Sequence, residues 1–157
     1  MLILKLTLND ITMFEKLYQL VKSHAQGAIF NNPLISGHHH EAIVIEASST
    51  IIEVLKGQME NGKVDDLINF FQLANFDYNS VTKKVVNKFA NKLNNYYNID
   101  ASKALIIANN LIQPVMVELI KQSKNSQNKE FLLSNMLTKL NGNKADLSGL
   151  VKRLSVA

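Results

Sequence analysis

Cysteine is absent from this chain of 157 residues, so disulfides and metal sites built on thiolates are excluded. Glycine and proline are scarce, with six and two residues, and this scarcity disfavours a turn-rich β-sandwich or β-barrel. Hydrophobic residues nevertheless make up 46% of the chain, which is enough to form a core without cross-links. We therefore predict an all-α protein, a compact multihelical bundle of about six to seven helices.

Arginine is nearly absent, because 16 of the 17 basic residues are lysine and the exception is Arg153. The formal charge of +4 is typical of nucleic-acid binders, but recognition of phosphates and bases favours the rigid fork of arginine. The lysines are scattered, and Tyr96 falls on an apolar helical stripe, which predicts core packing rather than base stacking. Nucleic-acid binding through lysine is therefore the weakest of the functions considered.

Motifs of nucleophilic catalysis and of phosphate binding are missing too. The glycines form neither a Gly-x-Gly-x-x-Gly pattern nor a Walker loop, and Gly-x-Ser-x-Gly does not occur. Ser48-Ser49-Thr50 lies within a helical pattern, and Asp65-Asp66 has the position of ordinary first-turn acids. We predict no enzymatic activity, no catalytic residue and no cofactor.

Apolar runs of the roughly 18–20 residues that span a bilayer are also lacking. The apolar stretch Leu2–Leu8 lacks the basic start and the cleavage site of a secretory signal, so we expect no membrane span and a cytoplasmic protein. We treat residues 1–12 as an N-terminal extension, either an arm or a prolongation of the first helix. Residues 13–157 then form one multihelical domain, with subdomains 13–75 and 80–157 as the alternative.

Helical periodicity is the strongest pattern that is present. Thr12–Glu15 has the spacing of a capping box and predicts that the first helix opens there. Apolar residues recur every four positions over 43–59, which predicts a long helix that begins at His39 or His40 and stops at Gly62. Further helices are predicted over 64–71, from Ser80 to about Tyr96, over 130–141 and over 146–154.

The segment from Ala101 to about Gln122 is the most apolar helix of the chain, with Asp100 as its N-cap. Its apolar residues cover more than one face, so we predict a central, buried helix. Pro114 lies inside it and is expected to kink or break it near Leu111.

Gly37-His38-His39-His40-Glu41 is the most conspicuous local feature. Three imidazoles and a carboxylate at a helix start are candidate ligands of a divalent metal ion. Consecutive helical residues point about 100° apart, however, and the second histidine of a zinc-protease motif is missing after His40. We interpret the cluster as a solvated junction, with metal or small-ligand binding by His38–Glu41 as the alternative function.

Four segments, namely 13–17, 31–33, 41–43 and 46–58, together resemble the YidB-like family of bacterial proteins of unknown function, in particular its Bacteroidetes members. The segment 99–116, with Leu111-Ile112-Gln113-Pro114, is similar to the core helix pair of that family. The resemblance implies an all-α, multihelical fold and carries over no catalytic residue. This chain has far fewer glycines than the family usually has, so glycine-rich linkers are not expected here.

Taken together, these observations predict a non-enzymatic helical protein that acts through contacts with a protein partner or with itself. Ile106 and Val117 lie off the main apolar stripe of the segment 101–122. We predict that they form the interaction surface, because a wide apolar arc exceeds what one core-facing stripe requires.

Overall fold

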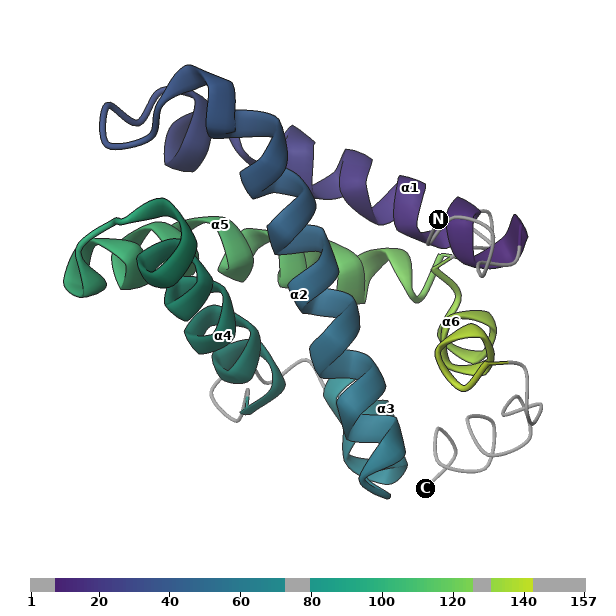
Figure 1. Cartoon of the computed structure of the whole chain (residues 1–157). Helices are drawn as coiled ribbons and strands as arrows, with labels where there is room; N and C mark the ends of the chain where they lie inside the picture. Colours follow the sequence, from purple (N-terminus) through teal and green to yellow (C-terminus); the bar gives the residue numbers. More distant parts are fainter. Residues whose placement is uncertain (1–7, 73–79, 126–130, 143–157) are drawn as a thin grey trace.

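The structure, a computed structural model, describes residues 8–72, 80–125 and 131–142, and each regular element in these ranges is helical (Figure 1). The α-helices are α1 (Leu8–Ser23), α2 (His40–Glu60), α3 (Val64–Gln72), α4 (Ser80–Tyr97), α5 (Ala101–Gln122) and α6 (Leu133–Leu140). Between α1 and α2 lie a π-helical turn, η2 (Gln26–Phe30), and a 3₁₀ turn, η3 (Gly37–His39). The prediction of an all-α multihelical bundle is confirmed.

Helix α2 is the element around which the others assemble. It contacts α1, α3, α4 and α6, and Figure 1 shows it crossing the molecule between the η3 end and α3. Ile43, Ala47, Ile51 and Leu55 are buried on one stripe, as the four-residue spacing predicts. Burial of each Ile or Leu contributes about 1.5–3 kcal/mol, so this stripe holds a large part of the core.

Helix α5 is continuous through Pro114, so the predicted break near Leu111 does not occur. Pro114 lies on the exposed side of α5, where water can solvate the carbonyl of Asn110 that the missing N–H leaves without a helical donor. The predicted burial of its apolar stripe is confirmed by nine buried residues, but α5 is not enclosed, because it packs on α4, α1 and η2 with its other side exposed. Leu105 in particular, predicted to extend the buried surface, is 46% exposed.

Two further expectations are corrected near the ends of helices. Helix α1 begins at Leu8, so Thr12 lies inside the helix rather than at its cap, and residues 8–12 are not a separate arm. Tyr96 is 70% exposed rather than in the core. It lies in the last turn of α4, and the chain reverses just beyond at Asn98 (φ 57°), so that Ile99 is the residue buried there.

Glycines end two helices in the way that the sequence indicates. Gly62 follows α2 with φ 73°, and Gly142 follows α6 with φ 68°, the left-handed region that glycine adopts without strain. Helix α6 begins at Leu133, inside the predicted range 130–141. The helix predicted over 146–154 and residues 1–7 lie outside the described residues.

Candidate functional site

The solvent-facing side of α5 carries the exposed apolar residues that the sequence singled out. Six large hydrophobic side chains are exposed among the described residues, and three of them, Leu105, Ile106 and Val117, belong to α5. Ile106 is 60% and Val117 41% exposed. The two residues predicted as an interaction surface are therefore accessible to a partner.

Ile106, Asn110, Gln113 and Val117 form one stripe along this side of α5, because residues four, seven and eleven positions apart share a helix face. We call this stripe the α5 face. Ile106 and Val117 lie about 16 Å apart along the axis at 1.5 Å per residue. The α5 face therefore has an apolar residue at each end and two carboxamides between them.

The α5 face carries no charge. From Ala104 to Val117 the sequence has no Asp, Glu, Lys, Arg or His, and Lys103 and Glu118 flank this stretch. Seven of these fourteen positions are buried, and the seven exposed ones form an uncharged surface on a protein with a net charge of +4 and 19% charged residues. Charged side chains are depleted at the centres of protein interfaces, so this composition favours contact with another protein.

Length and composition alone would also allow α5 to cross a membrane. It is the one helix among the described residues that passes this test, and half of its most apolar stretch is buried inside the protein. The core helix of a globular protein meets the same criterion, since it too is long and apolar. The expectation of no membrane span stays a prediction.

The histidines at the start of α2 do not converge on a common point. The Nδ1 atom of His38 lies 2.8 Å from the Ser36 hydroxyl, and the His39 ring meets the Tyr97 ring edge-on at 5.3 Å. The His40 ring packs edge-on against another ring, that of Phe30, at 5.2 Å. The His38 and His39 rings also contact each other, with their centroids 4.2 Å apart, but His40 packs on Phe30 instead. The described residues contain no group of three His, Asp or Glu side chains that could hold a metal ion.

Glu41, the fourth candidate ligand, binds to α1 instead. The Tyr18 hydroxyl donates a hydrogen bond to its carboxylate, and Lys22 Nζ lies 3.0 Å from Oε1. The hydrogen bonds from Tyr18 and Lys22 lower the pKa of Glu41, and the bond to this carboxylate raises the pKa of Tyr18. Glu41 therefore links α2 to α1, and its carboxylate is bound by Tyr18 and Lys22.

The other candidates of the sequence also have structural places. The Ser48 hydroxyl donates to the Val44 carbonyl at 2.9 Å, and Thr50 donates to the Glu46 carbonyl at 2.7 Å. Asp65 and Asp66 lie in the first turn of α3, as predicted. Each of these two hydroxyls thus donates to a backbone carbonyl of its own helix.

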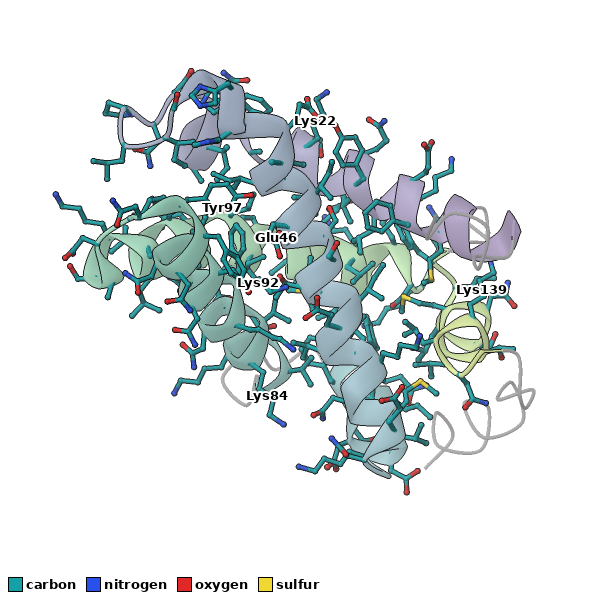
Figure 2. All side chains as sticks on the ribbon, viewed as in Figure 1. Lys22, Glu46, Lys84, Lys92, Tyr97 and Lys139 are labelled. Carbon is teal, nitrogen blue, oxygen red and sulfur yellow. The ribbon has the colours of Figure 1, made fainter. Side chains whose placement is uncertain are left out.

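Lys92 is the polar centre that the sequence did not reveal. Its Nζ lies 3.1 Å from Glu46 Oε1, 3.0 Å from Glu53 Oε1 and 3.0 Å from Thr50 Oγ1, so it joins α4 to α2 (Figure 2). The side chain is only 14% exposed. A spacing of three and four among Glu46, Thr50 and Glu53 on α2 was the available signal, but it does not identify the partner helix.

In this cluster, burial and the neighbouring charges shift the pKa values of Glu53 and Lys92 in opposite directions. Partial burial disfavours the ionised form of Glu53, but hydrogen bonds from Lys92 and Lys88 outweigh it, so the pKa of Glu53 is below its usual value. Burial likewise opposes the charge of Lys92, yet Glu53 and Glu46 raise its pKa. Burial and the nearby Glu46 raise the pKa of Tyr97. The shifts of Glu53 and Lys92 favour the ion-paired state, and the shift of Tyr97 favours the neutral phenol.

No family model, no curated protein and no solved structure matches this chain. The resemblance to the YidB-like family therefore stays a prediction that rests on the residues named above.

Proposed function

We propose that this protein is a non-enzymatic helical module that associates with a second copy of itself through the α5 face. The observation that carries the proposal is the uncharged stretch from Ala104 to Val117, with Ile106 and Val117 exposed on it. Copies of a protein with charge +4 repel one another, and an uncharged face is where that repulsion is smallest.

The order of residues on the α5 face suits antiparallel pairing about a two-fold axis. In such a contact residue i of one copy meets residue j of the other, and j meets i. An axis between Leu111 and Ile112 places Ile106 opposite Val117 and Asn110 opposite Gln113. Apolar residues then meet apolar residues, and carboxamides, which both donate and accept hydrogen bonds, meet carboxamides.

The small size of this face predicts a weak dimer. A standard interface buries about 800 Å² per partner, whereas one side of a three-turn helical stretch supplies only a fraction of that area. We therefore expect association in the micromolar range or weaker, set by concentration, rather than a permanent oligomer.

Sedimentation velocity over a wide concentration range tests the proposal. Wild type should shift from monomer to dimer, and the Ile106→Ser/Val117→Ser variant should remain monomeric with an unchanged melting temperature. Ile45→Ser on α2 is the matched control, because Ile45 is 46% exposed on another helix and its replacement should leave the dimer intact. A wild type that stays monomeric at all concentrations, or a dimer that survives the double substitution, contradicts the proposal.

A further inference from the structure

A polar groove runs along α4, on a different part of the surface from the α5 face. One hollow of about 430 Å³ lies between α2 and α4, and a second of about 410 Å³ lies between α4 and α5. Asn87 and Asn91 line both hollows, so the two adjoin along α4 with these exposed side chains at their common edge. We call the two adjoining hollows together the α4 groove. Two adjoining hollows along one helix suit a segment of polymer better than a compact small molecule.

Carboxamides line the length of the α4 groove. Asn87, Asn91 and Asn94 are four and three residues apart and therefore share one face of α4. Asn94 donates to the Ile99 carbonyl at 2.8 Å, whereas Asn87 and Asn91 are exposed and make no side-chain hydrogen bond among the described residues. A carboxamide both donates and accepts, which matches the alternating N–H and C=O groups of an extended peptide.

Positive charge lies at one end of the groove. Lys84 Nζ contacts only a neutral partner among the described residues, Gln58 Oε1 at 2.8 Å, and Figure 2 places Lys84 at the end of α4 far from Lys92. Lys88 is 3.1 Å from Glu53, with both side chains more than 40% exposed. An exposed pair of this kind is worth at most about 1 kcal/mol, so an incoming carboxylate can compete for Lys88. The other end has Leu105 on its wall.

Gly57 of α2 leaves the floor of the groove open. Glycine inside a helix costs about 1 kcal/mol relative to alanine, yet no atom lies within 4 Å of the position that a Cβ would take. Packing within the protein therefore does not require glycine here. A bare backbone at this place allows a ligand chain to approach α2 closely.

We propose that the α4 groove binds an extended acidic peptide of another protein. The groove from Lys84 to Asn94 spans ten helical residues, about 15 Å, which corresponds to four or five residues of extended chain. The peptide carries Asp or Glu at the Lys84 end and an apolar residue at the Leu105 end. Single-stranded nucleic acid fits less well, because no aromatic side chain lines either hollow and base stacking therefore has no platform.

A peptide array tests this proposal directly. The array presents short peptides with Asp or Glu at one end, Leu, Ile or Val at the other and varied uncharged residues between, in both orientations. A second set carries Lys in place of the acids. The acidic set should bind and the basic set should not. The side-chain amide signals of Asn87 and Asn91 should shift in ¹⁵N NMR spectra when the best peptide is added.

Variants of Gly57 separate binding from folding. Gly57→Gln fills the floor without removing a donor or a charge, so it should abolish binding while the protein remains as stable as wild type. Gly57→Ala is the matched control and should bind within about twofold of wild type, because its Cβ meets no atom within 4 Å. Asn87→Ala combined with Asn91→Ala should weaken binding by about 10-fold or more, at roughly 1 kcal/mol per hydrogen bond.

Three outcomes overturn the proposal: an acidic set that does not bind, binding that survives Gly57→Gln, and a short oligothymidine that binds more tightly than the best peptide. The proposal is independent of the α5 face. Ile106→Ser/Val117→Ser should bind the peptide as wild type does, so failure of the dimer and failure of the groove are distinguishable.

Discussion

Lys92 shows how one side chain can fix the angle between two helices. Its ammonium group bonds to Glu46, Thr50 and Glu53 of α2 while its stem lies along α4, and it is largely shielded from solvent. Pairs of this kind are weak at an exposed surface, but removal of the shared cation takes away the Lys92 partner of Glu46 and leaves Glu53 with Lys88 alone. The geometry of the α4 groove therefore depends on Lys92.

Replacement of this residue, Lys92→Met, keeps the apolar stem and removes the charge. We expect a loss of about 1–3 kcal/mol in the free energy of unfolding, because Glu46, Thr50 and Glu53 lose the ammonium group that they share. Lys88→Met is the control: Lys88 also pairs with Glu53 but is 49% exposed, so its loss should cost less than about 1 kcal/mol. Urea denaturation measures both, and equal losses would contradict the account.

The ion pair between Lys92 and Glu53 also predicts how the stability of the protein depends on pH in acid. The pKa of Glu53 is lower in the folded protein than its ordinary value of 4.5, so its contribution is present above that value and is lost as pH falls through the lowered pKa. The Lys92→Met variant lacks the main hydrogen bond that lowers this pKa. Between about pH 6 and pH 3, wild type should therefore lose more stability than the variant. Parallel curves for the two proteins would refute this interpretation.

Replacement of Gly57, in contrast, is predicted to increase the stability of the protein. Gly57→Ala should stabilise the protein by about 0.5–1 kcal/mol, because alanine has the higher helix propensity and its Cβ meets no neighbouring atom. Thermal melting followed by circular dichroism at 222 nm checks it. Gly62→Ala is the opposite control, since its φ of 73° disfavours any Cβ, and this variant should melt below wild type. A lower melting temperature for Gly57→Ala would show that the floor of the groove is closed.

At the scale of elements, the long helices were predictable because one pattern determines each of them. The apolar residues of α2 recur every four positions over more than four turns, and a left-handed glycine follows. On α4, Tyr96 follows Leu93 by three positions and is exposed, whereas Tyr97, four positions after Leu93, packs against the core. Burial near a helix end also depends on where the chain reverses. The spacing of apolar residues predicts which side of a helix is apolar, but it does not predict how far the neighbouring helices extend.

Helix α5 and the α4 groove show a second feature that the sequence does not predict, namely which surfaces the neighbouring helices leave uncovered. Apolar residues on more than one face of α5 indicated burial, but α2 occupies the central place and one side of α5 is left uncovered. Ile106 and Val117 could be singled out because they lie off the main stripe. The α4 groove could not, because it depends on the angle between α2 and α4, and Asn87 and Asn91 look like any of the chain's nineteen asparagines.

The two sides of α5 should respond differently to truncation. Ile112 and Met116 are fully buried, so Ile112→Ala and Met116→Ala should each cost about 2–5 kcal/mol through lost burial and a residual cavity. Ile106→Ala and Val117→Ala should change the stability of the monomer by less than about 0.5 kcal/mol, yet weaken association. Melting and sedimentation of all four variants check this. If all four only lower the melting temperature, the α5 face is not an interaction surface.

At the scale of the whole molecule, the two proposed surfaces have different chemistry. The α5 face is uncharged and suits a second copy, whereas the α4 groove has a positive end and suits an acidic peptide. They share no residue, but the groove reaches Leu105 of α5, next to Ile106 of the α5 face. A dimer would present two grooves, which raises the effective affinity for a partner with two acidic segments.

The absence of cysteine allows the antiparallel dimer to be tested by cross-linking. Ile106→Cys and Val117→Cys are prepared separately, mixed at high concentration and oxidised mildly. Disulfides need Cα atoms within about 4.4–6.8 Å, a distance that antiparallel pairing gives to position 106 of one copy and position 117 of the other. The account predicts a cross-link between the two variants and little between copies of either one, whose positions lie about 16 Å apart. Efficient cross-linking of Ile106→Cys to itself, or none in the mixture, would contradict it.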